Sequence, residues 1–214
     1  MSNPSPAVSR NNNLKAAYRH LRDVYPTLNW LFDATGEIAL PDPTPLPVST
    51  SLVKIVVGQM LSVAAARTIW ERLITTATEI GVGVHDLPFD ELRAAGLSAR
   101  KAKTIELIAQ IVGDDVHYLE TWRSLSYTQL HASVRSIWGL GDWSAAMLGI
   151  FQFGHPDVFP LSDGSLLRAL RLVEMKFYDN GAFQPCAAAP YRSYLALTLW
   201  NALDARLLSN DELT

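Results

Sequence analysis

Apolar side chains recur every three or four positions along most of the chain, which is the spacing of one face of an α-helix. The longest such segment, residues 51–76, is dense enough in apolar positions to be a buried core helix with a break or bend at 58–62. The same spacing predicts helices at 14–24, from 26 onward, and at 90–95, 98–112, 126–137, 142–154, 166–177 and 190–208. No segment alternates as a strand does, so we expect an all-α fold.

Three segments lack this pattern. Residues 1–13 are rich in Ser, Asn and Pro, which predicts a disordered tail. Residues 36–49 contain four prolines, which predicts an extended linker. Residues 118–125 are expected to be a polar connection. Between two predicted helices, Gly96 is placed to end the first and Ser98 to cap the second.

The composition limits the class of protein. The chain has 214 residues, 49% of them apolar, which suffices for one sizeable core or two small lobes. Its single cysteine, Cys186, excludes a disulfide framework and an iron–sulfur cluster held by four cysteines. The polar start does not resemble a signal peptide and no apolar run reaches the length of a membrane span, so we expect a cytoplasmic protein.

The net charge of −3 argues against a protein that coats nucleic acid, because such proteins are usually basic. A protein that binds only a few phosphates needs no more than a local positive face. The candidates for such a face are Arg93, Arg100, Lys101, Lys103, Arg135, Arg168, Arg171 and Arg192. Scattered, solvated charges explain the same residues equally well.

A tight turn at Gly139-Leu140-Gly141 joins two predicted helices. Glycines permit positive φ and close approach of another backbone, and the N–H groups that open the second helix suit an anion such as phosphate. An ordinary turn between two helices is the alternative. Further on, Asp163 follows an apolar run and lies at the start of a predicted helix. An N-cap role explains it on position alone, and Ser162 is an alternative cap.

The stretch from residue 136 to 168 resembles the helix-hairpin-helix DNA glycosylases, and within them the alkylpurine branch of the 3-methyladenine DNA glycosylase II type. That pattern is a hairpin LPGIGxWTA, a PDVFP segment and then a catalytic Asp. The matching positions are Gly139, Gly141, Trp143, Ala145, Gly154, residues 156–160 and Asp163. Further matches extend the resemblance over roughly residues 26–203. They include Pro190 with residues 192–194, and residues 96–98 with Lys101 and Ala102.

The resemblance implies two helical lobes with a DNA-binding cleft between them. The central lobe would span 51–163, with the helix-hairpin-helix at about 126–154, and the terminal lobe would combine 14–50 with 164–214. The chain looks like the compact form, without the N-terminal β domain of some relatives. Its expected partner is double-stranded DNA with damaged bases, bound by a monomer in the bacterial nucleoid or, in a eukaryote, the nucleus.

For the chemistry, the resemblance implies that Asp163 stabilises the cationic sugar of the transition state. The implied base pocket consists of Trp143, Trp200, Met147, Trp138 and Tyr191, although core packing is the alternative for each tryptophan. Relatives that also cut the DNA backbone place a lysine where Trp143 stands. Trp cannot form a Schiff base, so a monofunctional hydrolase without lyase activity is implied.

Contacts with the DNA backbone are also implied by the resemblance. Met60, with Gln59 before it, would fill the gap left by the displaced base, whereas a satisfied core amide is the alternative for Gln59. The implied phosphate-binding residues are Gly139, Gly141, Asp142, Trp143, Ser62, Lys101 and Arg168. The sequence departs from the family at two of the hairpin positions. Trp138 replaces a proline, and Asp142 brings a negative charge that repels phosphate.

No cofactor is expected, apart from a structural Na⁺ or K⁺ on the main-chain carbonyls of Arg135, Ile137 and Leu140 as the family has it. No His, Cys and Asp cluster has the spacing of a catalytic metal site. Three hypotheses follow: a monofunctional alkylpurine glycosylase, a protein that binds damaged DNA or abasic sites without cleavage, and an all-α protein-interaction module. Retention of Asp163 favours the first.

Overall fold

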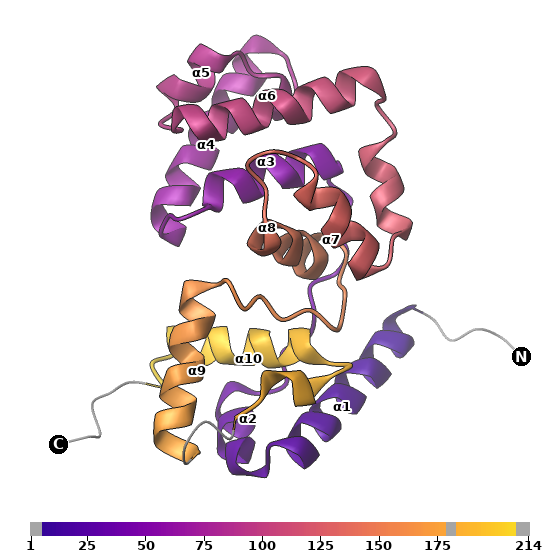
Figure 1. Ribbon diagram of the computed structural model, residues 1–214, viewed down its shortest axis with the longest axis vertical. Coiled ribbons are helices and arrows are strands. Elements are labelled where there is room, and N and C mark those ends of the chain that lie inside the picture. The colour runs from indigo at the N-terminus through magenta and orange to yellow at the C-terminus, as the bar shows by residue number, and fades with distance from the viewer. Residues whose placement is uncertain (1–5, 179–182, 209–214) are drawn as a thin grey trace, which may run out of the picture. The chain divides into compact units, whose positions relative to one another are not determined.

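The computed structural model describes residues 6–178 and 183–208, and within those ranges the chain is helical and contains no strand (Figure 1). The predicted all-α class is therefore confirmed. By its internal contacts the chain divides into two compact units: unit 1 comprises Met1–Pro41 and Gly154–Thr214, and unit 2 comprises Asp42–Phe153. Within the ranges that the structure describes, no helix has the length and apolarity needed to span a bilayer.

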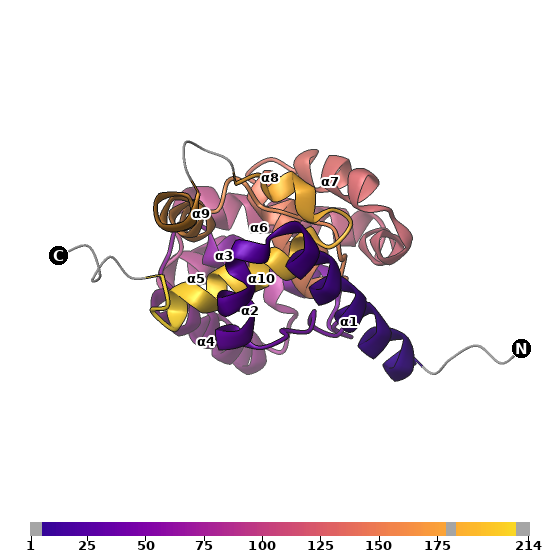
Figure 2. The ribbon, with the colours of Figure 1, turned by 90° about the horizontal axis from the view of Figure 1, so that it is seen from below.

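Unit 1 is built from both ends of the chain. Its longer helices are α1 (Pro6–Val24), α2 (Asn29–Thr35), α9 (Gly164–Phe177) and α10 (Arg192–Asp204). Helix α10 packs against α9, α2 and α1 (Figure 2). Side chains from both ends fill one apolar core, and the buried Tyr18 hydroxyl is hydrogen-bonded to Thr198 Oγ1 at 2.9 Å. The N-terminal helices therefore bury their apolar faces against helices near the other end of the chain.

Unit 2 has a separate core around helix α3. Its helices are α3 (Val48–Gly58), α4 (Val63–Ile80), α5 (Phe89–Ala94), α6 (Ala99–Asp114), α7 (Tyr127–Arg135) and α8 (Asp142–Met147). Helix α3 packs against α4, α6 and α8. The side chains of Leu52, Val56, Ile105 and Leu130 are fully buried in this core. The prediction of a buried core helix over 51–76 is therefore correct for α3, which contacts helices on several sides. It is wrong for α4, where only Leu73 and Ala77 are buried.

Local signals placed several elements correctly. The predicted break at 58–62 separates α3 from α4, and Ser98 caps α6 by accepting a hydrogen bond from the Lys101 N–H. Gly96 has φ +109°, as a glycine that ends a helix requires. Ser126 opens α7 with a reciprocal capping box to Gln129.

Three predictions about elements were wrong. The helix predicted from residue 14 begins at Pro6, so residues 6–13 are helical; residues 1–5 of the predicted tail lie outside the described residues. The polar connection at 118–125 is a 3₁₀ helix, Leu119–Ser124, that buries Trp122. The helix predicted over 142–154 stops being α-helical at Met147 and continues as a π-helical segment, Leu148–Gln152.

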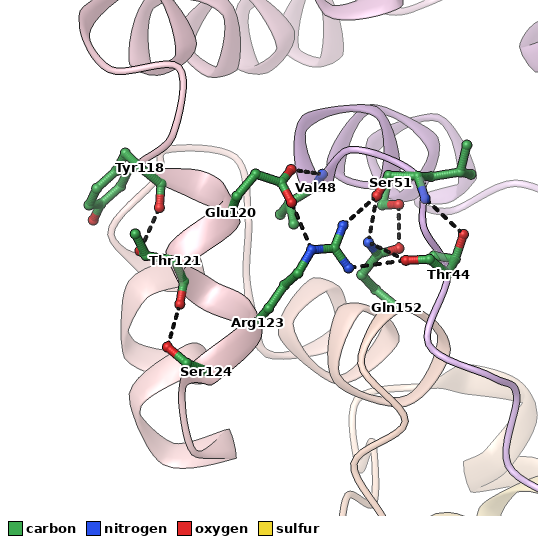
Figure 3. A network of polar contacts seen from close by, with 10 residues as sticks. Thr44, Val48, Ser51, Tyr118, Glu120, Thr121, Arg123, Ser124 and Gln152 are labelled. Carbon is green, nitrogen blue, oxygen red and sulfur yellow. Dashed lines mark hydrogen bonds and ion pairs between the residues drawn. The ribbon is translucent and has the colours of Figure 1, made fainter. Parts of the chain in front are cut away.

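The boundaries of the two units differ from those expected for the two lobes. The central lobe was expected over 51–163, whereas unit 2 runs from Asp42 to Phe153. Residues 42–47 belong to unit 2 because their main chain is bonded to its side chains (Figure 3). The segment from Gly154 to Asp163 belongs to unit 1, where it packs on α10.

Polar contacts secure both places where the chain passes between the units (Figure 3). The Thr44 N–H donates to the Gln152 carbonyl at 3.2 Å. This hydrogen bond joins the segment where the chain enters unit 2 to the segment where it leaves that unit. The Gln152 side chain, 2% exposed, donates to the Leu46 carbonyl at 2.9 Å and accepts from Ser51 Oγ at 2.6 Å. The buried amide of Gln152 therefore connects the first and last segments of unit 2 to helix α3.

An ion pair supports the same segment. Arg123 donates to the carbonyls of Thr44 and Leu46 at 3.0 and 2.7 Å, and its Nε lies 2.7 Å from Glu120 Oε2. The other Glu120 oxygen accepts from the Val48 N–H at 2.7 Å (Figure 3). That N–H opens α3 and has no partner within the helix, so a carboxylate there is favourable.

Candidate active site

Asp163 caps helix α9 in unit 1. Its Oδ1 accepts from the Leu166 N–H at 2.8 Å and from the Trp200 indole N–H at 3.0 Å. The cap is Asp163 and not Ser162. The N-cap interpretation is therefore correct, and it is compatible with a catalytic role because a carboxylate has more acceptor sites than these two donors occupy. Two donors on one oxygen also fix the direction in which the carboxylate faces.

The segment that leads to Asp163 is fastened to the start of α10. Ser193 is fully buried, and its N–H donates to the Pro156 carbonyl at 2.9 Å. Its hydroxyl accepts from the Val158 N–H at 2.9 Å and donates to the His155 carbonyl at 2.7 Å. One serine thus satisfies three main-chain groups of this segment, which fixes its path.

A second anchor is the ion pair between Arg192 and Asp157. The guanidinium contacts the two carboxylate oxygens at 2.6 and 2.8 Å, a bidentate arrangement. Hydrogen bonds from Arg192 lower the pKa of the Asp157 carboxyl below its usual range. Sequence reasoning matched these residues to the family but assigned the anchoring role to none of them. The only signal was that residues 156–160 and residues 192–194 both matched the family pattern.

The predicted pocket residues are placed as follows within each unit. In unit 1, Trp200 bonds to Asp163, while the ring of Tyr191 packs against His20 and Tyr194 at centroid distances of 5.6 and 6.0 Å. In unit 2, Met147 is 8% exposed, and Trp143 lies against the end of α3, where its Cη2 is 3.7 Å from the position a Cβ on Gly58 would take. Trp138 is 53% exposed and packs on Arg100. Their role around a base stays a prediction.

The hairpin turn between α7 and α8 sits directly on α6. Gly139 has φ +89°, and a Cβ there would lie 2.0 Å from Thr104 Oγ1. Only glycine satisfies both conditions. Thr104 is 1% exposed, so the turn is pressed against the helix. Gly141, in contrast, has room for a side chain.

Asp142 follows the turn and is paired on its own hairpin. Its Oδ1 lies 2.9 Å from His131 Nε2 and 3.3 Å from Arg135 Nε, both on α7. These contacts join the two hairpin helices and place positive charge against the carboxylate. The repulsion of phosphate expected from Asp142 is therefore partly offset by the positive charge of Arg135.

The loop between α3 and α4 exposes Met60 completely. Met60 has φ +55°, an unusual value for a residue other than glycine, and its side chain is 100% exposed. Ser62 closes the loop as the N-cap of α4. An apolar side chain held in solvent by a constrained backbone is what a wedge between bases requires, and the wedge role stays a prediction.

Two polar side chains hold this loop in place. Gln59 Nε2 donates to the Gly139 carbonyl at 3.0 Å and to Ser144 Oγ at 3.1 Å, so both donors of its NH₂ group have partners and the side chain joins the loop to the hairpin. Lys101 Nζ donates to the carbonyls of Val57 and Gln59 at 2.9 and 2.7 Å. These carbonyls lie at the end of α3, where a cation is favourable. Burial lowers the pKa of Lys101.

Most residues of the proposed positive face have partners within the protein. Arg93 donates to the Leu97 carbonyl, and Lys103 lies 3.3 Å from Glu106 Oε2. Arg168 and Arg171 are exposed on α9. Among the residues that the structure describes, no group of three His, Cys, Asp or Glu side chains is placed to hold a metal ion.

Comparison with known proteins assigns the family. Residues 53–176, more than half of the chain, match the profile of the HhH-GPD superfamily base excision DNA repair protein. The chain belongs to this superfamily. The HhH-GPD match includes the loop with Met60, the hairpin and Asp163. The resemblance inferred from the sequence is thereby confirmed at the level of the family.

Individual HhH-GPD relatives carry related names. The chain is 29% identical over 160 residues to DNA-3-methyladenine glycosylase 1 of Schizosaccharomyces pombe, covering 70% of this chain and 69% of that protein. A crystal structure of a DNA-3-methyladenine glycosidase from Bacillus halodurans has a TM-score of 0.68 at 25% identity, covering 89% of this chain and 91% of the other. The 3-methyladenine DNA glycosylase of S. pombe, solved with abasic DNA, has a TM-score of 0.71 at 24% identity, covering 88% and 97%.

Proposed function

We propose that the protein is a monofunctional DNA glycosylase that hydrolyses the N-glycosidic bond of alkylated purines of the 3-methyladenine or 7-methylguanine type. The observation that carries this proposal is the Asp163 carboxylate, fixed by Leu166 and Trp200 within a chain of the HhH-GPD superfamily. The names of the relatives support the substrate class.

In the proposed reaction the damaged base first leaves the helix stack. The bond between C1′ and the base nitrogen breaks, and its electrons leave with the cationic base, which becomes neutral. Positive charge develops on the sugar, and the Asp163 carboxylate stabilises it. Water then adds to C1′ and loses a proton. Because the base is already a good leaving group, one carboxylate suffices.

The proposed partner is duplex DNA with a damaged base, bound by a single copy of the chain where chromosomal DNA is present. Met60 would fill the gap in the stack, while the main chain of Gly139, Gly141 and Trp143 would bind a backbone phosphate. For a monovalent cation we propose the carbonyls of Arg135, Ile137 and Leu140. The Ile137 carbonyl accepts from the Leu140 N–H at 3.1 Å and keeps a second lone pair.

The test is base release from methylated duplex DNA by the protein and by Asp163→Asn. Asn is also a good N-cap and can accept from Leu166 and Trp200, so the variant removes the charge while keeping the fold. We expect release of 3-methyladenine or 7-methylguanine without strand nicking, and a loss of about 10²-fold or more in the variant. No release by either protein, with tight binding to abasic DNA, would instead support a damage-binding protein.

A further inference from the structure

An exposed Trp–Arg pair stands beside the hairpin turn of unit 2. Trp138 immediately precedes Gly139 and is 53% exposed, and the guanidinium carbon of Arg100 lies 5.4 Å from the centre of its ring. Arg100 is also exposed. The ring covers one face of the guanidinium, and the edge that carries the N–H donors remains available to a ligand.

Both residues stand on rigid supports. Thr104 Oγ1 donates to the Arg100 carbonyl at 3.1 Å, and Gly139 rests on Thr104 one helical turn away from Arg100. The turn is also held by Gln59 through the Gly139 carbonyl. The register of the hairpin on α6 therefore brings Trp138 to Arg100, and the guanidinium is positioned before any ligand arrives.

The surrounding charges single out Arg100. Its neighbour Lys101 is committed to the end of α3, Lys103 is paired with Glu106, and Arg135 is paired with Asp142. Within residues 6–178 and 183–208, no carboxylate forms an ion pair with Arg100. A cation that is preorganised, exposed and unpaired by a carboxylate is suited to an anion of planar fork geometry.

We propose that Arg100, held flat by Trp138, binds a phosphodiester of the DNA backbone beside the hairpin turn. This inference rests on the proposed function. It places Trp138 on the backbone side of the interface and not in the base pocket. It also explains the replacement of a proline by Trp138, because proline would offer the guanidinium no aromatic face.

The test measures the Kd for a duplex containing an abasic-site analogue between about 50 and about 200 mM salt. The variants are Arg100→Gln, Trp138→Ala and the double variant, with Arg19→Gln on α1 as a control of equal charge change. We expect Arg100→Gln to weaken binding about tenfold at the lowest salt and to reduce the salt slope by about one, while Arg19→Gln changes neither. Trp138→Ala should weaken binding only when Arg100 is present.

Other outcomes are distinguishable. Binding by the unaltered protein with no effect of Arg100→Gln would overturn this inference alone. A loss from Trp138→Ala that is equal in both backgrounds, with lower base release at saturating enzyme and an unchanged salt slope, would return Trp138 to the base pocket. Failure of the unaltered protein to bind or process damaged DNA would overturn the proposed function and this inference together.

Discussion

Among single residues, Asp157 and Ser193 matter to the site without any part in its chemistry. They fix the segment that ends at Asp163, one through its carboxylate and the other through its hydroxyl. Asp163 in turn is fixed at its own oxygen by a main-chain N–H and an indole. The direction of the carboxylate is therefore determined by a chain of hydrogen bonds that starts at the first turn of α10.

Asp157 makes stability depend on pH. Because Arg192 lowers the pKa of this carboxyl in the folded state, the pair stabilises the fold above the unfolded pKa of about 4, and that stability is lost as the pH falls through the lower folded pKa. We expect Asp157→Asn to reduce the free energy of unfolding by about 1 kcal/mol at neutral pH, a modest value because the pair is partly exposed. Denaturant titrations should show this difference narrowing at about pH 3.

The control is Glu71→Gln, which breaks the exposed pair with Arg67 on α4. That variant should change stability little at either pH. An Asp157→Asn penalty that stays constant down to about pH 3 would mean that the carboxylate charge is not what Arg192 requires.

Among the elements, the hairpin depends on one close approach. In Gly139→Ala the new Cβ meets Thr104 Oγ1 at 2.0 Å on a backbone of φ +89°. We expect a loss of about 2–5 kcal/mol, from the strain of a positive φ and from overpacking. In Gly141→Ala nothing lies within 4 Å of the new atom, so stability should stay within about 0.5 kcal/mol. Denaturant unfolding of both variants measures the contrast, and equal effects would contradict it.

The loop between α3 and α4, which carries Met60, is held in place by the side chain of Lys101. Lys101→Met removes two hydrogen bonds from the main chain next to Met60 but keeps most of the side-chain volume. We expect kcat/KM for base release to fall by about 10–100-fold because the wedge is misplaced. Lys103→Met, on the exposed side of the same helix, should remain near the unaltered protein.

Salt dependence separates this supporting role from the phosphate contact inferred from the sequence. If Lys101 only supports the loop, Lys101→Met should leave the salt slope of DNA binding unchanged. A slope reduced by about one would mean that the ammonium reaches a phosphate.

For the whole molecule, the sequence predicted what depends on nearby residues. The all-α class, the break after Gly58, the Ser98 cap and the hairpin all follow from helical spacing or from capping chemistry within a few positions. The tail was misjudged because composition alone suggested disorder, whereas Pro6 suits the first turn of a helix and α1 is anchored by Tyr18 and Leu21.

The remaining features are hydrogen bonds between residues far apart in the sequence, and no periodic pattern of apolar positions indicates them. Gln152 meets Ser51 across about a hundred positions, Lys101 meets Gln59, and Ser193 meets Val158. Lys101 and Gln152 resemble ordinary surface polar residues until tertiary structure supplies their partners. The family motif marked Asp163 and the hairpin, but not the contacts that hold them in place.

The split composition of unit 1 has a consequence for the newly made chain. Unit 2 is continuous, so all of its core is available on a ribosome once residue 153 has emerged. Helices α1 and α2 are made before unit 2, yet their apolar partners on α9 and α10 are made after it. During synthesis α1 and α2 therefore wait with their apolar faces uncovered, while every residue of unit 2 is available before α9 and α10 are made.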